Sequence, residues 1–367
     1  MNEKIKHTEP LIRISERDDL VWWKSWLVRV IAVVLALVLC SVIIILITGY
    51  NPIQVYLAMI RGSFGTNRKL WIMLQNLAML LCISLAVTPA FKMRFWNIGA
   101  EGQVLVGGLA TAAVMFYAKD SLPPFIMIIT MLAASLVAGI IWAMIPAFFK
   151  AKWNTNETLF TLMMNYVATQ LVSFFIMIWV PSGSSVMGII NQDSQAGWLP
   201  EIFGQKYLLN ILIVAAVTIA MFIYLKYSKQ GYEISVVGES ENTAKYIGIN
   251  VKKVILRTMG LSGAICGLAG FLLVSGTNHT ITTTTAGGMG FTAIMVSWLG
   301  KFNAVIMVLT SFIIVFLQRG AGEIATKFNL NQSVADILTG IILFFIIGCE
   351  FFVNYKINFR TGHKEGK

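Results

Sequence analysis

Three polar side chains lie close together where an apolar stretch of the chain begins. Residues 95–103 read Phe-Trp-Asn-Ile-Gly-Ala-Glu-Gly-Gln and contribute Asn97, Glu101 and Gln103, just before the apolar run 104–114. Polar groups at membrane depth cost several kcal/mol unless they are paired or hydrated. The two glycines permit a broken helix, which is tolerated only where it faces protein or a water-filled cavity. The pattern favours a hydrogen-bonding path for a polar solute. Its alternative is helix packing, with Glu101 as an interfacial cap.

A fourth polar side chain, Asn165, lies about two turns into the apolar run that follows residues 154–157. Asn156 or Thr155 is suited to cap a helix at this point, and Glu157 suits the first turn of that helix. Capping does not explain Asn165. An interhelical hydrogen bond and a place on the solute path are equally favoured for it.

The second informative stretch is the polar island Gly231–Asn250, which separates two long apolar runs. Ser240 is a suitable N-cap and Gly248 a suitable C′ residue, so the spacing predicts a short helix over residues 241–247. Acidic residues on both sides of Ser240 complement the positive end of its dipole. A hydrophilic segment this short cannot fold alone. We therefore expect it to lie across the membrane surface and offer a docking face, and an ordinary loop is the alternative.

Catalytic and metal-binding patterns are missing from the sequence. His7, His279 and His363 are far apart in sequence, and the four cysteines fall within apolar runs at spacings that match no metal motif. No Gly-rich loop ending in Gly-Lys-Ser/Thr is present, so ATP binding by that route is not expected. The sequence predicts no enzyme, no metal site and no cofactor in this chain.

The composition indicates a membrane protein. Of the 367 residues, 57% are hydrophobic and 12% are charged, whereas soluble chains carry about 25% charged residues. About 20 apolar residues span the hydrocarbon core. We predict an all-α polytopic bundle of about ten membrane-spanning helices, the eighth being too short to span unaided. The predicted spans are 25–48, 70–90, 101–118, 123–149, 157–180, 208–227, 253–275, 289–300, 303–319 and 333–352.

Lys and Arg predict the orientation of these spans. With the N-terminus inside, the 28 basic residues divide into 21 on the inner side and 7 on the outer side. Both termini are therefore predicted to be cytoplasmic, with tails at 1–24 and 353–367, a single transmembrane domain at 25–352, and the polar island within a cytoplasmic segment at 228–252. Positive-inside bias and anionic lipid headgroups account for the net charge of +11 without a nucleic-acid partner.

Three motifs resemble the permeases of ATP-binding-cassette (ABC) importers, in the branch that carries simple sugars and nucleosides. The run Asn-Ile-Gly-Ala-Glu-Gly-Gln at 97–103 resembles the nucleoside-type permeases of that branch. The pattern Asn-Glu-x-Leu-x-Thr-Leu-Met-x-Asn-Tyr at 156–166 also resembles the family. The third motif is the polar island Gly231–Asn250, which resembles the cytoplasmic coupling segment of these permeases. Ser235 and Thr243 depart from the family pattern there. The matching residues are Gly231, Val237, Gly238, Glu239, Asn242, Ala244, Tyr246, Gly248 and Ile249.

The resemblance implies a permease subunit in the plasma membrane of a bacterium, forming half of a translocation pathway for nucleosides. It implies three protein partners: an ABC ATPase with two fused cassettes, a second related permease and an extracellular substrate-binding lipoprotein. ATP would be hydrolysed on the ATPase. The residues expected to contact that ATPase are Gly238, Glu239, Asn242, Ala244, Tyr246, Gly248 and Ile249. Ala244 and Gly248 are expected on one helix face, where small residues let a partner approach closely.

A nucleoside needs hydrogen-bonding groups for its ribose and base, and an aromatic or apolar wall for stacking. Phe95, Trp96 and Trp298 are candidates for that wall, and anchoring at the membrane interface explains the two tryptophans equally well. A permease for simple sugars is one alternative, and an ion-coupled secondary transporter is another. An intramembrane enzyme is the weakest hypothesis. The residues expected to line the substrate pathway are Asn97, Glu101, Gln103, Asn165, Phe95, Trp96 and Trp298.

Overall fold

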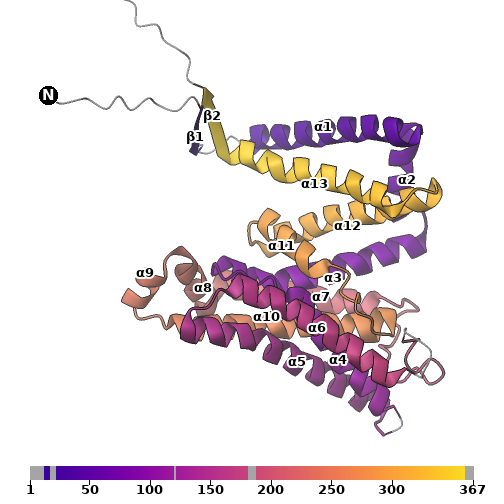
Figure 1. Cartoon of the computed structure of the whole chain (residues 1–367), viewed down its shortest axis with the longest axis vertical. Coiled ribbons are helices and arrows are strands. Elements are labelled where there is room, and N and C mark those ends of the chain that lie inside the picture. The colour runs from indigo at the N-terminus through magenta and orange to yellow at the C-terminus, as the bar shows by residue number, and fades with distance from the viewer. Residues whose placement is uncertain (1–11, 17–21, 120, 181–186, 360–367) are drawn as a thin grey trace, which may run out of the picture. The chain divides into compact units, whose positions relative to one another are not determined.

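The computed structural model describes residues 12–16, 22–119, 121–180 and 187–359, which are mostly helical (Figure 1). The elements are β1 (Ile12–Glu16), α1 (Trp22–Thr48), α2 (Pro52–Phe64), α3 (Asn67–Lys92), α4 (Ala100–Tyr117), α5 (Pro124–Trp153), α6 (Glu157–Trp179), α7 (Leu208–Tyr227), α8 (Lys229–Glu239), α9 (Glu241–Tyr246), α10 (Val251–Leu273), the π-helical turn η1 (Val274–Asn278), α11 (Met289–Leu299), α12 (Ala304–Lys327), α13 (Gln332–Asn354) and β2 (Tyr355–Phe359).

Nine helices in the described part of the chain are long and apolar enough to cross a membrane. α11 is apolar but has only 11 residues, which is about half the length that a span requires. The prediction of an all-α polytopic membrane protein with about ten spans is confirmed. The eighth predicted span is a half-length helix, separated from α12 by a turn in which Lys301 and Phe302 have positive φ.

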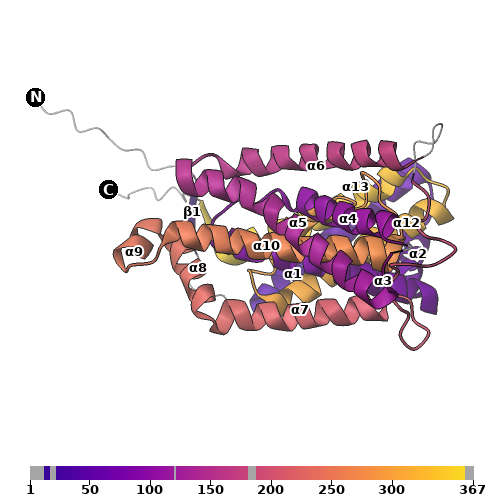
Figure 2. The same cartoon turned by 90° about the horizontal axis from the view of Figure 1, so that it is seen from below.

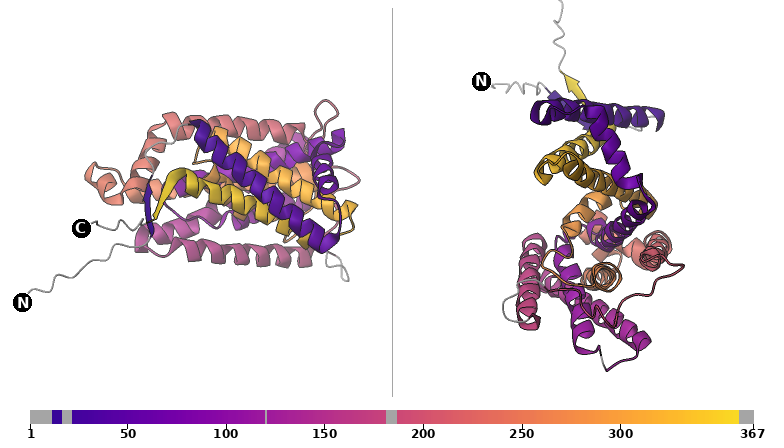
Figure 3. Two further views of the ribbon diagram at one scale, coloured as in Figure 1. Left: turned by 90° about the horizontal axis from the view of Figure 1, so that it is seen from above. Right: turned by 90° about the vertical axis from the view of Figure 1, so that its right-hand side faces the viewer.

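The chain forms two compact units. The first contains the described residues of Met1–Gly65 and Leu317–Lys367. In it, α1 packs along α13, and Arg29 on α1 forms a 2.7 Å ion pair with Glu350 on α13. β1 and β2 pair antiparallel, with Ile12 opposite Phe359 (Figure 3). The described ends of the chain therefore lie side by side, an arrangement that the prediction of two plain tails did not include. The remainder of those tails lies outside the described residues.

The second unit, Thr66–Phe316, is built around α10. α10, α3 and α4 are mostly buried, whereas only 22% of the residues in the most apolar stretches of α5, α6 and α7 are buried. Glycines allow backbone contact at the centre of this unit. A Cβ at Gly139 on α5 would collide with the carbonyl of Gly263 on α10, and a Cβ at Gly267 would collide with the carbonyl of Ser135. Small residues at such crossings are typical of helix packing in membranes.

α3 and α10 run antiparallel, and each is followed by a break. Gln75, early on α3, bonds to Thr277 near the end of the α10–η1 span. Asn97, just beyond α3, bonds to Ser262. Ser262 is the twelfth residue of the 28-residue span Val251–Asn278, about 17 Å from its start. The break at 93–99 therefore returns to about mid-depth, where α4 begins. The break at 279–288 returns to the same depth, because α11 begins beside the first turn of α4.

Candidate functional site

The first turns of α4 and α11 meet through a carboxylate. Glu101 lies in the first turn of α4. Its Oε1 accepts a hydrogen bond from the backbone N–H of Gly288 at 2.8 Å, and its Oε2 accepts one from the N–H of Gly290 at 2.8 Å. These are N–H groups that the start of α11 would otherwise leave unpaired. A Cβ at position 290 would collide with the backbone of Glu101, so this close approach requires glycine. Glu101 thus joins the first turns of α4 and α11, two helices that each begin after a break at about mid-depth.

A buried amide network fixes the break between α3 and α4. The Oδ1 atom of Asn97 accepts hydrogen bonds from the N–H of Gly99 at 3.1 Å and from Gln103 Nε2 at 3.2 Å. Asn97 Nδ2 donates to Ser262 Oγ on α10 at 3.1 Å. Asn97 and Gln103 are both buried. The network supplies partners that the irregular backbone lacks.

α6 supports the same break from its other side. Asn165 Oδ1 accepts from the N–H of Gly102 at 2.8 Å, and its Nδ2 donates to the carbonyl of Ile98 at 2.8 Å. Thr161 Oγ1 accepts from the N–H of Ile98 at 3.2 Å. An interhelical hydrogen-bonding role, one of the two hypotheses for Asn165, is therefore confirmed. The structure brings Asn97, Glu101, Gln103 and Asn165 together around the start of α4.

The predicted aromatic residues separate into two environments. Phe95 is buried. Trp96 and Trp298 are 46% and 48% exposed, and their rings stack with centroids 5.8 Å apart. Trp298 lies near the C-terminal end of α11, whereas Glu101 bonds to the N-terminal end of that helix. The Trp298 ring also contacts Phe91. A cavity of about 360 Å³ adjoins Trp298 of this pair and is lined by Phe91, Lys92, Arg94, Ser235, Gly238, Glu239, Trp298 and Phe302. The aromatic pair therefore lies beside the polar segment that follows α7.

That polar segment forms two helices, α8 and α9, at one end of the second unit (Figure 2). The predicted short helix is confirmed, since Ser240 Oγ accepts from the N–H of Thr243 at 3.2 Å and α9 ends at Tyr246. Gly248 has φ +84°, and the N–H of Ile249 bonds to the carbonyl of Ala244 at 2.9 Å. This is the glycine-dependent C-terminal motif that the sequence predicted. The preceding helix α8 was not predicted.

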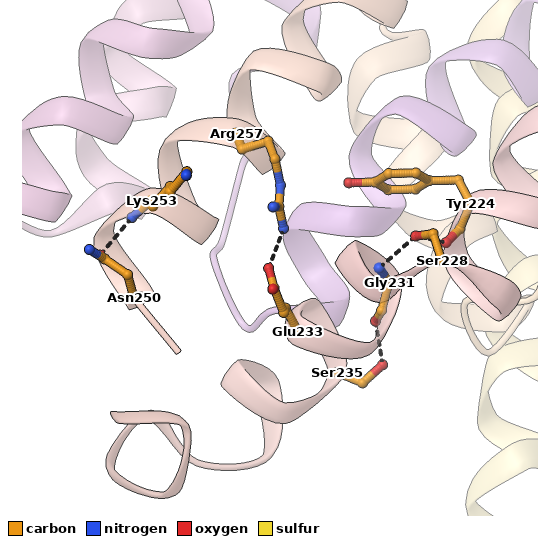
Figure 4. Close-up of polar contacts among 8 residues, drawn as sticks. All are labelled: Tyr224, Ser228, Gly231, Glu233, Ser235, Asn250, Lys253 and Arg257. Carbon is orange, nitrogen blue, oxygen red and sulfur yellow. Dashed lines mark hydrogen bonds and ion pairs between the residues drawn. The ribbon is translucent and has the colours of Figure 1, made fainter. Parts of the chain in front are cut away.

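α8 is tied to the helices on both sides of it (Figure 4). Arg257 on α10 forms a 2.8 Å ion pair with Glu233. Ser228 Oγ accepts from the N–H of Gly231 at 2.9 Å, which caps the start of α8. A Cβ at Gly238 would collide with the carbonyl of Lys92 at the end of α3. A displacement of α8 would therefore act on both α10 and α3.

Three residues predicted to contact the ATPase face inward instead. Gly238 is buried against the end of α3, and Ile249 is half-buried. Ala244 is fully buried and belongs to an apolar cluster with Ile234, Val237 and Val251, against which Ile249 also packs. The expectation that Ala244 faces a partner is wrong, because its side chain supports α9 from within. The exposed residues of the segment Gly231–Asn250 are Tyr232, Glu239, Glu241, Asn242, Thr243, Lys245, Tyr246, Ile247, Gly248 and Asn250, with Tyr246 92% exposed.

Sequence reasoning missed Phe291, and it did not connect Gly288 with Glu101. Phe291 follows Gly290 directly and is 45% exposed. The signal was present in the sequence, because a threonine run at 282–285 ends in Gly287 and Gly288. Such a run followed by an apolar segment of half length indicates a broken helix at membrane depth.

Comparison with known proteins identifies the type of molecule to which this geometry belongs. Residues 69–347 match the family described as "Branched-chain amino acid transport system / permease component". The chain belongs to this permease family. It is the membrane-spanning permease subunit of an ABC importer, and it is not an enzyme.

Relatives of this permease match it over most of their length. The guanosine ABC transporter permease protein NupP of Bacillus subtilis is 30% identical over 345 residues, covering 93% of this chain and 97% of that protein. The nucleoside ABC transporter permease protein NupB of Lactococcus lactis subsp. cremoris is 27% identical, covering 87% and 90%. The glucose ABC transporter permease protein TsgB13 of Haloferax volcanii is 27% identical, covering 94% and 93%.

Proposed function

We propose that this permease carries nucleosides across the plasma membrane of a bacterium. The 30% identity to a guanosine permease over nearly the full length of both chains supports this substrate class more than any other observation. The polar junction at mid-depth is compatible with it, because transporter sites commonly lie near the bilayer midplane where broken helices meet. Asn97, Gln103 and Asn165 hold the junction together, and Glu101, Trp96 and Trp298 are the groups that a solute could reach.

ATP is hydrolysed on a partner subunit that docks on α8 and α9. The partners of the assembly are an ATPase with two fused cassettes, a second related permease that completes the pathway, and an extracellular lipoprotein that delivers the substrate. The exposed face of α9 supports the docking role, and the contacts of α8 with α3 and α10 supply a route for the motion. ATP binding would favour one state of the pathway by its differential affinity for the two states.

Uptake of labelled compounds by the assembled transporter tests this proposal. Guanosine, uridine, ribose and glucose are supplied to cells that express all subunits and to matched cells that lack this permease. Permease-dependent uptake of the nucleosides supports the proposal. Uptake of free sugars with no uptake of nucleosides would replace it with a simple-sugar permease, the class suggested by the glucose relative.

A further inference from the structure

The irregular segment 279–288 runs from His279, which packs on Trp198 of the outer loop, back to Glu101 at about mid-depth, and Gly287 near its end is exposed. Gly287 and Gly288 have φ of +59° and +74°. A Cβ on Gly288 would meet open space, and one on Gly287 would meet only the carbonyl of Thr284 at 3.9 Å. Irregular backbone at this depth cannot face lipid tails, because its polar groups would lack partners, so it lies against protein or a water-filled cavity. This surface therefore faces protein or water rather than lipid.

The carboxylate of Glu101 lies directly beside that surface and is half-buried. Each oxygen receives one backbone N–H, from Gly288 or from Gly290. A carboxylate offers about four acceptor positions and no donor, so each oxygen keeps capacity for one more hydrogen bond. The group suits a ligand that presents two neighbouring donors. The start of α11 is already served by this carboxylate, and the N–H groups of Gly99 and Gly102 at the start of α4 bond to Asn97 and Asn165, so neither helix start is a seat for a phosphate.

An aromatic residue directly follows a glycine that bonds to the same carboxylate. Phe291 follows Gly290 on α11 and is 45% exposed, on the helix face that it shares with Trp298. Amphipathic ligands with a planar end and a hydroxylated end match a ring placed beside an acceptor pair. A nucleoside has this construction, since its base is planar and its ribose carries adjacent 2′- and 3′-hydroxyl groups.

We propose that Glu101 accepts hydrogen bonds from the 2′- and 3′-hydroxyl groups of the transported nucleoside, whose base lies against Phe291. This inference rests on the proposed nucleoside function and assigns its specificity to one side chain. The ribose is common to all nucleosides whereas the base varies, so a permease that reads the diol accepts several bases. A ligand without both hydroxyl groups leaves the acceptor pair unused and binds about ten- to a hundredfold more weakly.

Binding to the permease is measured apart from the extracellular protein, which has its own selectivity. The complex of both permeases with the ATPase is placed in lipid nanodiscs, and labelled guanosine is displaced by unlabelled guanosine or 2′,3′-dideoxyguanosine. We expect the dideoxy compound to compete about ten- to a hundredfold more weakly. Equal competition by the two compounds in the unsubstituted complex overturns the assignment without recourse to any variant.

Variants test whether Glu101 is the residue that distinguishes guanosine from 2′,3′-dideoxyguanosine. In Glu101→Gln, the preference for guanosine over the dideoxy compound should fall to near one. Glu101→Asp shortens the side chain, which moves both carboxylate oxygens away from the ligand and should reduce the preference for guanosine. This second variant keeps the test usable if Glu101→Gln does not assemble. Glu157→Gln, at another first helical turn, is the matched control and should keep the full preference. Phe291→Leu should weaken both ligands alike.

Two outcomes separate failure of this inference from failure of the proposed function. If assembled Glu101 variants keep the unsubstituted preference, Glu101 does not read the diol, although nucleoside transport stands. If cells that express the whole transporter take up no nucleoside, the proposed function fails and the inference fails with it.

Discussion

Arg257 on α10 and Glu233 on α8 form a 2.8 Å ion pair in which both side chains are mostly buried. The pair connects the segment that is expected to meet the ATPase with the central helix of the second unit. Because α10 also holds the break after α3 through Ser262 and Asn97, the contact is a short link between the docking segment and the mid-depth junction.

We expect Arg257→Met to weaken the coupling of ATP hydrolysis to transport. Loss of one partner leaves a partly desolvated charge, which costs about 1–3 kcal/mol at such a site. The variant should insert and assemble, but transport per ATP hydrolysed should fall severalfold. The exchanged pair Arg257→Glu with Glu233→Arg should recover part of the coupling. Normal coupling of ATP hydrolysis to transport in Arg257→Met would show that the ion pair has no part in it.

Tyr246 is the best side chain for testing ATPase docking. It is 92% exposed on α9, so Tyr246→Ala removes apolar contact area without disturbing the fold of the segment. We expect copurification with the ATPase to fall, since exposed aromatic residues dominate many interfaces. Tyr166→Ala, at an exposed tyrosine of α6, is the matched control and should copurify normally.

Ala244→Glu has a different expected effect, because the side chain is buried. A carboxylate placed among Ile234, Val237 and Val251 should unfold α9 locally, as burial of a charge without a partner is costly. Loss of docking in this variant is therefore accompanied by increased hydrogen exchange over residues 240–250. Docking lost without increased exchange would show that position 244 faces the partner after all.

Asn165→Ala should impair transport by loosening the start of α4. The change removes the two 2.8 Å hydrogen bonds to Gly102 and Ile98, and each backbone group left without a partner costs about 1–3 kcal/mol. We expect a lower melting temperature of the permease together with reduced uptake. Thr169→Ala, one turn further along α6, removes only a local bond to the carbonyl of Asn165 and should have little effect.

The sequence predicted the spans well because lipid requires long apolar helices, and this requirement is visible in composition. It predicted α9 well for a local reason, since Ser240 and Gly248 act on the backbone within a few residues of themselves. The helix α8 was missed because two glycines and three β-branched residues weaken its local preference for helix. It is stabilised by packing on α3 and α10.

The mid-depth junction was predicted only in part. Asn97, Glu101 and Gln103 were recognised because polar residues at the edge of an apolar run are conspicuous. Their partners were not, because Gly288 lies 187 residues away in the chain. The inward orientation of Ala244 depends on which face of α9 packs on α8 and α10. A six-residue helix carries too few apolar positions to show that face.

The orientation of the second unit is testable by thiol labelling. Gln195 and Glu241 lie near opposite ends of α10: the loop with Gln195 bonds to Ser275 through Leu199, and Glu241 precedes the first turn. The basic residues place Glu241 inside. A cysteine at position 195 should react with an impermeant reagent added outside sealed cells, and a cysteine at 241 should react only after permeabilisation. Labelling of position 241 from outside would reverse the predicted orientation.

We expect His279 to make the outer loop sensitive to acid. The imidazole is buried and stacks on Trp198 with ring centroids 3.8 Å apart. Burial, with the charge of Lys206 adding to it, lowers the pKa of His279 from 6.5 to about 4. Because the folded state favours the neutral ring, the stabilising effect is complete above about pH 6.5 and is lost as the pH falls toward 4. At pH 5 the loss amounts to about 2 kcal/mol.

We expect the described loop residues 187–200 to open in acid, since the backbone of this loop bonds to His279 and Ser275. Hydrogen exchange of the loop, measured between pH 7 and pH 4.5 and corrected for the intrinsic rate, should rise at the lower pH. His279→Phe keeps a ring against Trp198 but cannot take up a proton, so its loop should show no such rise. An equal rise in both proteins would assign the acid sensitivity to another group of the loop and remove His279 from the explanation.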